Sequence, residues 1–372
     1  MFDYLIVGSG LYGAVFAYEA TKAGKTCLVL ERRNHIGGNC YTEERNGIQV
    51  HMYGAHIFRT SKKYIWNYMQ QFAEFNHFVN CPIANYCGKI YNMPFNMNTF
   101  SRIWNICTPN EAKEIIKKQR QEITGTPQNL EEQAISLVGR DVYELLIKGY
   151  TEKQWGRSCH ELPASILRRL PVRFTYDNNY FNDPYQGIPI GGYTQIIKKM
   201  FEKSEIKLNT DFNNAPLHYR MLAKKILYTG TIDSYFNYCY GPLEYRSLRF
   251  EHEYLETDNY QGVAVVNYTD RETPYTRSIE HKHFEFGMQP YTIITKEYPL
   301  EGTQDVEPYY PINDVKNQNR YQRYFKLGQK ENNIIFAGRL GAYQYTDMQD
   351  TVISALKLVD KEIYSKGDKD WI

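Results

Sequence analysis

A strand, a glycine-rich turn, a helix and a second strand follow one another within the first thirty residues, and this order constrains the fold more than any other feature. The apolar run 4–7 leads into residues 8–13 (GSGLYG), residues 14–23 have helical character, and the apolar run 26–30 is followed at once by Glu31. In a dinucleotide-binding βαβ unit the glycines let the backbone approach a pyrophosphate, and the acid accepts hydrogen bonds from a ribose hydroxyl. The alternative is a buried βαβ unit that binds nothing. The strand, the helix and the acid, however, all stand at the spacing expected of a dinucleotide-binding unit.

Two further features favour FAD over NAD as the nucleotide. Gly37 and Gly38 follow Glu31 closely, and glycines let the backbone pass close to a large cofactor; a plain turn is the alternative. Towards the other end of the chain, the apolar strand 333–337 precedes a helix predicted over 348–363. We expect the N-terminus of this helix to point at the flavin ring, where its partial positive charge stabilises a reduced flavin.

Composition excludes several classes of protein. The chain has 372 residues, which suggests two or three domains, and its 42% hydrophobic and 23% charged residues are ordinary for a soluble globular protein. A net charge of +2 implies no strong field for nucleic acid or membrane. Seven cysteines without a C-x-x-C argue against a disulfide framework and a zinc site and fit a reducing cytoplasm. We expect no transmembrane segment and no secretory signal.

Hydrophobic periodicity divides the rest of the chain. Short strands are expected between 78 and 95, helical periodicity dominates from 99 to about 170, and the alternation of antiparallel strands dominates from 243 to 298. We therefore predict an α/β fold in which a Rossmann-like FAD-binding domain carries a helical insert and an antiparallel β-sheet domain. The predicted boundaries are 1–76, 187–236 and 306–372 for the discontinuous FAD-binding domain, 77–172 for the mainly helical domain with a mobile loop, and 173–186 with 237–305 for the substrate-binding sheet domain.

Several basic residues are candidates for binding an anion. His56 and Arg59 lie in a glycine loop, and Arg168-Arg169 end a segment bounded by glycine and proline, which suits a mobile loop that closes over an anion. A structural histidine and a solvated basic turn are the alternatives. Arg246 and Arg277 fall within predicted strands, and arginines in a half-buried sheet usually need an anion or carboxylate partner.

Six separate motifs resemble, in the same order, those of the bacterial UDP-galactopyranose mutase family, and the resemblance covers essentially the whole chain. Besides the N-terminal glycines they are Gly149-Tyr150-Thr151 with Gln154-Trp155-Gly156, residues 169–173 (RLPVR), Tyr275-Thr276-Arg277 with Glu280-His281, residues 308–311 (PYYP), and residues 338–341 (GRLG) with Tyr345 and Asp347-Met348.

The resemblance implies an isomerase that interconverts UDP-galactopyranose and UDP-galactofuranose without net redox change. In this family reduced FAD is active, and its N5 attacks the anomeric carbon and displaces UDP. The furanose product would serve surface polysaccharide, and the enzyme would be a cytoplasmic homodimer. The alternatives are a flavin oxidase of the amine-oxidase type, which shares the nucleotide-binding architecture, and a flavin- or nucleotide-sugar-binding protein without catalysis.

The resemblance also assigns roles to individual residues. Catalytic roles fall to Arg169, Arg277 and His56, with the two arginines neutralising the diphosphate. Substrate contacts fall to Arg59, Asn80, Tyr150, Trp155, Arg168, Tyr180, Arg246, Asn267, Tyr310 and Tyr345. Flavin contacts fall to Gly8, Gly10, Leu11, Gly13, Glu31, Arg32, Gly38, Asn39, His56, Ile57, Phe212, Arg339, Thr346, Asp347, Met348, Gln349 and Thr351.

Three positions depart from the family pattern. Arg59 replaces a usual histidine, Arg168 replaces a common lysine, and Leu146-Ile147 stand where two phenylalanines near the uracil are frequent. An arginine presents several donors in a fixed fork and could meet an acetamido carbonyl at the sugar C2. We therefore hypothesise that UDP-N-acetylgalactosamine is a substrate as well as UDP-galactose. A tolerated substitution with unchanged specificity is the alternative.

Overall fold

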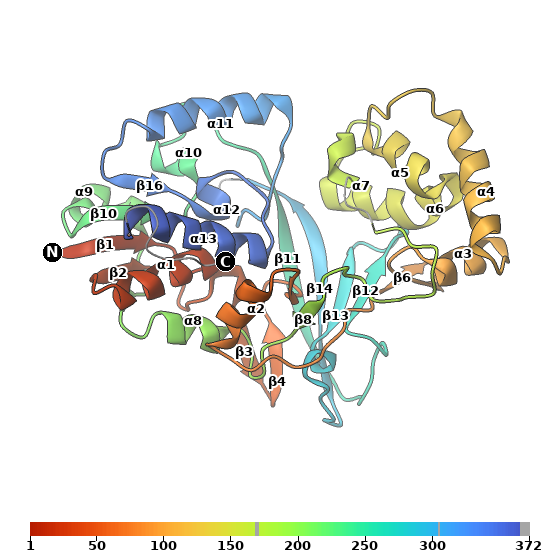
Figure 1. Ribbon diagram of the computed structural model, residues 1–372, viewed down its shortest axis with the longest axis horizontal. Coiled ribbons are helices and arrows are strands. Elements are labelled where there is room, and N and C mark those ends of the chain that lie inside the picture. The colour runs from red at the N-terminus through yellow and green to blue at the C-terminus, as the bar shows by residue number, and fades with distance from the viewer. Residues whose placement is uncertain (168–170, 304–305, 365–372) are drawn as a thin grey trace. The chain divides into compact units, whose positions relative to one another are not determined.

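The computed structural model describes residues 1–167, 171–303 and 306–364. The chain forms two compact units (Figure 1). Unit 1 contains residues 1–77, 183–245 and 302–372, and unit 2 contains residues 78–182 and 246–301. No helix in the described part of the chain is both long enough and apolar enough to cross a membrane.

Unit 1 is built on a five-stranded parallel sheet. In spatial order its strands are β16 (Ile334–Phe336), β10 (Ala223–Tyr228), β1 (Phe2–Val7), β2 (Cys27–Leu30) and β9 (Glu205–Lys207). Neighbouring strands pair in parallel throughout. The predicted strands at 4–7, 26–30 and 333–337 are therefore confirmed as members of one sheet.

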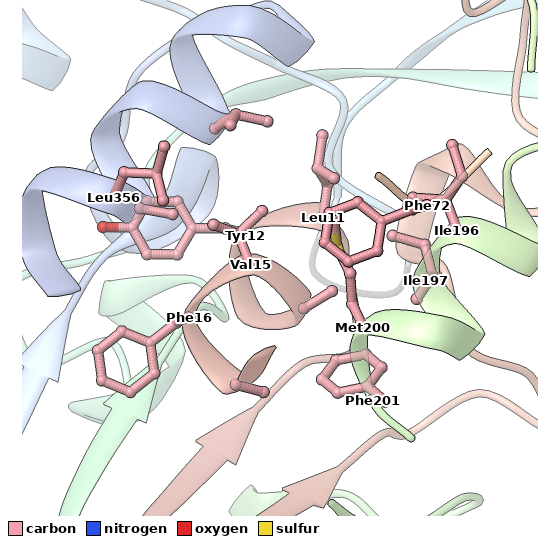
Figure 2. Packing of buried hydrophobic residues seen from close by; sticks show 14 of the residues in the cluster. Leu11, Tyr12, Val15, Phe16, Phe72, Ile196, Ile197, Met200, Phe201 and Leu356 are labelled. Carbon is pink, nitrogen blue, oxygen red and sulfur yellow. The ribbon is translucent and has the colours of Figure 1, made fainter. Parts of the chain in front are cut away.

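Helices cover one face of this sheet. They are α1 (Leu11–Lys22), α2 (Lys63–Gln70), α8 (Thr194–Met200) and α13 (Met348–Glu362). Figure 2 shows Val15 of α1, Ile197 of α8 and Leu356 of α13 among the side chains of the shared core. Strand β1 follows the period of two, because Ile6 enters this core and Leu5 enters a second cluster around Phe212 on the other face. The helix predicted over 348–363 is confirmed as α13.

Shorter elements complete unit 1. Strands β3 (Thr42–Arg45) and β4 (Ile48–His51) form a hairpin, and β5 (Phe58–Thr60) pairs antiparallel with β8 (Tyr185–Gly187). The remaining elements are α9 (Pro216–Arg220), α10 (Ile232–Tyr235), β15 (Tyr310–Pro311), α11 (Val315–Gly328) and α12 (Gly338–Gly341), with short 3-10 turns at Gly38–Cys40 and Phe212–Asn214.

Unit 2 contains a sheet and a helical layer. Its strands follow the order β11 (Tyr245–Leu255), β14 (Thr292–Glu301), β13 (Arg277–Glu280), β12 (Val265–Tyr268), β6 (Ile83–Tyr86) and β7 (Lys89–Asn92). Most pairs are antiparallel, as predicted, but β12 and β6 pair in parallel, so the sheet is mixed. The short strands expected between 78 and 95 are confirmed from Ile83 onward, and the expectation is wrong for residues 78–82, which form no strand.

The helices of unit 2 are α3 (Met97–Trp104), α4 (Pro109–Gln119), α5 (Leu130–Val138), α6 (Arg140–Val142), a π-helix (Tyr143–Lys148) and α7 (Gly149–Trp155), with 3-10 turns at Arg120–Glu122, Ala164–Leu167 and His281–Glu285. Side chains cap the first three of these helices, α3, α4 and α5. Thr108 and Glu111 form a reciprocal capping box at the start of α4, and Asn129 caps α5. The predominance of helices expected from residue 99 onward is therefore confirmed as far as Trp155.

Candidate active site

Two glycines of the turn after β1, Gly8 and Gly13, stand where a side chain would be strained or would clash. Gly8 has φ 100°, and a Cβ on Gly13 would lie 2.5 Å from the carbonyl oxygen of Gly8. A Cβ on Gly38 would lie 2.9 Å from the Cα of Gly10, and Gly37 donates its N–H to Ser9 O. The two predicted glycine segments therefore meet and bring their backbones together in front of the N-terminus of α1. Such a cradle fits the pyrophosphate of a dinucleotide.

Glu31, at the end of β2, is buried and held by donors of its own chain. Its Oε2 accepts hydrogen bonds from Ser9 N at 2.9 Å and Ser9 Oγ at 2.6 Å, and its Oε1 accepts one from Arg33 N at 2.9 Å. These bonds fix the carboxylate against the glycine turn. A carboxylate has about four acceptor positions, so Glu31 can still accept a hydrogen bond from a ribose hydroxyl.

Arg33 was missed by the sequence analysis, although it lies beside predicted cofactor contacts. Its Nη2 donates to Asn39 Oδ1 at 3.0 Å and pairs with Glu307 at 2.8 Å, while the guanidinium lies 4.4 Å from the ring centroid of Tyr53. Arg32 also pairs with Glu307 and is half exposed. Arg33 therefore links Asn39 to the strand end at Glu31. The only sequence signal was its position two residues after Glu31.

The ring of His56 is oriented by backbone contacts. Its Nδ1 lies 2.8 Å from Gly54 O, so this nitrogen carries the proton, because a carbonyl only accepts. Its backbone N–H donates to Nδ1 of His51 at 3.2 Å. His51 is buried, and burial together with the nearby His56 lowers its pKa to about 3. His51 is thus a neutral acceptor that supports the loop carrying His56 and Ile57.

Replacing His51 with asparagine should make the stability of the protein less sensitive to acid. The folded pKa of His51 lies below the unfolded value of 6.5, so its contribution to stability is complete above pH 6.5 and is lost as the pH falls towards 3. Between pH 7 and pH 5 the loss is about 2 kcal/mol. Urea unfolding of wild type and variant at pH 7 and pH 5 measures how the free energy of unfolding of each protein changes with pH. The contributions of carboxylates, which both proteins share, cancel when the two changes are subtracted. An equal pH dependence in the two proteins would contradict the assignment.

Arg59 on β5 lies between two carboxylates of unit 1. Its Nη1 is 2.5 Å from Asp183 Oδ2 and its Nη2 is 3.0 Å from Asp347 Oδ2. Thr60 Oγ1 donates to Gln349 Oε1 at 2.5 Å. Asp347 is the N-cap of α13 and accepts from Asp350 N at 2.9 Å. Strand β5 is therefore anchored to the first turn of α13.

The other predicted residues of unit 1 fall into three places. Met348 and Thr351 belong to the first turn of α13, and Thr346 immediately precedes its N-cap, with the Oγ1 atoms of Thr346 and Thr351 3.1 Å apart. The rings of Tyr310 and Tyr345 have centroids 5.7 Å apart, and Arg339 donates to Tyr309 O. Tyr345 is 62% exposed. The side chains of Leu11 and Phe212 are buried in the core, so any cofactor contact there would use mainly the backbone.

In unit 2, Arg277 brings three predicted residues together. Its Nε donates to Asn267 Oδ1 at 3.2 Å, and its Nη2 donates to Tyr150 Oη at 3.1 Å. Its Nη1 lies 3.4 Å from the buried carboxylate of Glu297. The sheet register places Asn267 and Glu297 opposite Arg277 on the two neighbouring strands. The carboxylate partner expected for a buried arginine is therefore Glu297.

Arg246 contacts the carboxyl end of α7. Its Nε donates to Gln154 O at 2.9 Å and its Nη2 to Lys153 O at 3.4 Å. Gly156 has φ 64°, and a Cβ there would lie 2.7 Å from Nη1 of Arg246. Burial and the like charge of Arg157 lower the pKa of Arg246. Arg246 therefore caps the helix that carries Tyr150 and Trp155.

The remaining predictions in unit 2 concern the 172–182 segment and the 143–148 segment. Tyr180 N donates to Asn80 O at 2.8 Å, so these two residues are neighbours. Arg173, to which no role was assigned, donates to Phe181 O at 3.1 Å and to the carbonyl of Asn179. Leu146 and Ile147 are buried in the core of unit 2. Arg168 and Arg169 lie outside the described residues.

Comparison with known proteins identifies the family. A family model for UDP-galactopyranose mutase matches residues 145–345, and one for an NAD(P)-binding Rossmann-like domain matches residues 6–72. A protein from Klebsiella pneumoniae named probable UDP-galactopyranose mutase is 39% identical over 372 residues, which cover 99% of this chain and 96% of that protein. The chain belongs to the UDP-galactopyranose mutase family. This result confirms the predicted family, the α/β fold class with a Rossmann-like domain, and an enzyme with a flavin cofactor.

Two further matches describe the range of the family. A protein from Escherichia coli named dTDP-fucopyranose mutase is 36% identical over 375 residues, covering 98% of this chain and 99% of that protein. A crystal structure of reduced UDP-galactopyranose mutase has a TM-score of 0.75 at 14% identity and covers 99% of this chain and 97% of that one. The structural match supports the fold. The names of the K. pneumoniae and E. coli relatives refer to different nucleotide sugars, UDP-galactose and dTDP-fucose.

Proposed function

We propose that this enzyme interconverts UDP-galactopyranose and UDP-galactofuranose, and that its flavin is FAD in the reduced form. The observation that carries the proposal is the group formed by Arg277, Asn267 and Tyr150, together with membership of the family. A guanidinium flanked by a phenol and an amide is suited to a diphosphate, because all three groups can donate hydrogen bonds to its oxygens.

The residues of unit 1 fit the cofactor. The meeting of Gly10 with Gly37 and Gly38 would admit the pyrophosphate, Glu31 would hold a ribose, and the first turn of α13 would face the flavin ring. Reduced FAD, when bound, would supply N5 as the nucleophile towards the anomeric carbon. His56 would contact the cofactor through a ring whose Nδ1 proton is held by Gly54 O.

The other residues of the chain would bind and orient the substrate. Arg277 and Arg169 would neutralise the diphosphate as it leaves C1 of the sugar and as it returns. Tyr150 and Trp155 would bind the nucleotide, and Tyr310 and Tyr345 would donate to phosphate oxygens. The bond from C1 to the diphosphate breaks and forms again, so the reaction needs no net electrons. We further propose a homodimer in the cytoplasm whose product supplies surface polysaccharide.

Arg59 bears on the choice of sugar. Asp183 and Asp347 hold its guanidinium in one orientation, and a guanidinium presents five N–H donors in a fixed planar fork. We propose that Arg59 also meets the acetamido carbonyl of UDP-N-acetylgalactosamine. The E. coli relative named dTDP-fucopyranose mutase makes a dTDP-6-deoxy sugar the second candidate substrate.

Replacing Arg59 with histidine should lower kcat/KM for UDP-N-acetylgalactosamine about tenfold or more relative to UDP-galactose. The reason is that a hydrogen bond from a charged donor contributes about 1.5–3 kcal/mol. Initial rates on both substrates for wild type and variant measure the ratio. Because the substitution also removes the contacts to Asp183 and Asp347, flavin content is measured alongside. An unchanged ratio would remove the proposed role of Arg59.

The decisive experiment is chromatography of UDP-galactose, UDP-N-acetylgalactosamine and dTDP-fucose after incubation with the flavin-loaded protein, with and without dithionite. We expect a furanose product from at least one substrate, and only with the reduced protein. Purified protein that stays colourless when supplied with FAD would contradict the proposal. Oxygen consumption in step with substrate would instead indicate an oxidase, an alternative that the two relatives named as mutases do not favour.

A further inference from the structure

Lys153 of α7 makes an unusual set of contacts. Its Nζ donates to three backbone carbonyls, those of Tyr268 at 2.9 Å, Thr273 at 2.9 Å and Tyr275 at 3.1 Å. An ammonium group has three donors and no acceptor, so all three of its hydrogen bonds end on one segment. This segment, residues 268–276, joins the end of β12 to the start of β13 and is called the β12–β13 turn below.

The β12–β13 turn lies between two residues of the Arg277 group. Asn267 immediately precedes it and Arg277 immediately follows it, while the third member, Tyr150, stands on α7 three residues before Lys153. Lys153 therefore ties the helix that carries Tyr150 to the turn that sets the spacing of Asn267 and Arg277.

A second contact shows how closely α7 approaches the same turn. A Cβ on Gly149, the first residue of α7, would lie 2.3 Å from the carbonyl oxygen of Thr269. The backbone of the helix thus touches the turn at Gly149, and Lys153 fastens it one helical turn later. Arg246 holds the carbonyls at the other end of α7. The short helix is therefore fixed at its start, middle and end.

The surroundings of Lys153 keep it charged at neutral pH. Burial lowers its pKa to about 8, whereas the nearby carboxylates of Asp270 and Glu272 oppose this shift. Other charged or titratable groups near the contact are the pair Arg271–Glu152 and, on the flanking strands, Tyr268, Tyr275 and Arg277. Burial raises the pKa of Tyr268 above its ordinary value, so this phenol stays neutral between pH 7 and 9.

We propose that Lys153 is a positioning residue that holds Tyr150 against Arg277 and so sets the affinity of the enzyme for the diphosphate of its substrate. The inference rests on the proposed function, in which these two residues bind the UDP moiety. Its chemical basis is that three carbonyls on one turn require a donor of three hydrogen bonds. Methionine, which has a similar unbranched length, cannot provide any of them.

The test is the variant Lys153→Met, with Lys148→Met as the matched control. Lys148 precedes α7 in the chain, but its Nζ contacts only the side chain of Glu144 and the ring of Tyr143 among the contacts described. We expect the Kd of UDP and the KM of the nucleotide sugar to rise about 10- to 100-fold in Lys153→Met, with a smaller change in kcat. FAD content should stay at the wild-type value, because the FAD contacts belong to unit 1. Lys148→Met should behave as wild type.

The pH dependence of UDP binding by wild-type protein provides a second measurement that needs no variant. Above pH 8 the neutral amine of Lys153 donates two hydrogen bonds instead of three, so UDP affinity should fall between pH 7 and pH 9, and Lys148→Met should show the same fall. A constant Kd over this range, or a wild-type Kd in a folded Lys153→Met, would overturn the inference. If wild-type protein is inactive on every nucleotide sugar, the proposed function is contradicted. The role of Lys153 is still tested in that case, because the Kd of UDP is measured without turnover.

Discussion

Replacing Arg277 with alanine should lower kcat/KM by about 10²- to 10³-fold. Arg277 donates to Asn267 and Tyr150 and lies 3.4 Å from Glu297, whose side chain is only 3% exposed. The fall in kcat/KM comes from the proposed pair between Arg277 and the diphosphate, because truncating one partner of a hydrogen-bonded charge pair at a binding site costs about 2–5 kcal/mol. The loss should be seen in both substrate affinity and turnover, because the proposed diphosphate contact is needed in the ground state and as the diphosphate leaves. Steady-state rates and UDP titration measure the two parts.

The control is Arg249→Ala, another arginine of the same sheet. Arg249 stands on β11, is half exposed, and pairs with Glu251 and the ring of Tyr298. Exposed ion pairs contribute about 0–1 kcal/mol, so this variant should retain near-normal activity. Arg277→Lys should recover only part of the loss, since an ammonium cannot reach Asn267 and Tyr150 with the geometry of a planar fork. Near-normal turnover in Arg277→Ala would contradict the proposed site.

Replacing Gly10 with alanine should raise the Kd of FAD at least about 100-fold while the protein stays folded. Among the described residues, apart from its two chain neighbours, a Cβ on Gly10 meets nothing closer than the Cα of Gly38 at 3.9 Å, so the apoprotein has room for it. In the proposed complex the same space is needed for the close approach of the pyrophosphate to the backbone. Flavin absorbance of the purified protein and titration with FAD measure the effect, and thermal unfolding of the apoprotein checks the fold.

Gly13→Ala is the informative comparison for Gly10→Ala. Its Cβ would lie 2.5 Å from Gly8 O and 3.0 Å from Cγ2 of Ile6, so the helix must move from the strand. Overpacking of this kind typically costs about 1–3 kcal/mol, and the apoprotein should be destabilised as well as deficient in flavin. A Gly10→Ala protein that purifies with the flavin content of wild type would show that the pyrophosphate binds elsewhere.

Features encoded in short stretches of sequence were predictable. The turn 8–13 lies between a strand and a helix, Thr108 and Asn129 cap helices, and α13 begins at Met348. Each depends on residues within a few positions of one another. The parallel pairing of β6 with β12 was not predictable, because the two strands are about 180 residues apart in the chain. The alternation of apolar and polar residues indicates that a segment is a strand but does not indicate which strand it pairs with.

The same distinction applies to the candidate site. Asn267 and Arg277 are ten residues apart on adjacent strands, whereas the contact of Arg277 with Tyr150 spans 127 positions and was suggested only by the family resemblance. The carboxylates that hold Arg59 lie 124 and 288 positions away. No local pattern distinguishes Lys153 from the other lysines of the chain. Its three acceptors are backbone carbonyls, which every residue has, so the sequence carries no sign of the contact.

The glycine turn and the Arg277 group belong to different compact units of one chain. A substitution beside Arg277 changes unit 2, whereas the proposed FAD contacts belong to unit 1, so in the proposed enzyme the diphosphate-binding group can vary separately from the residues that retain the coenzyme.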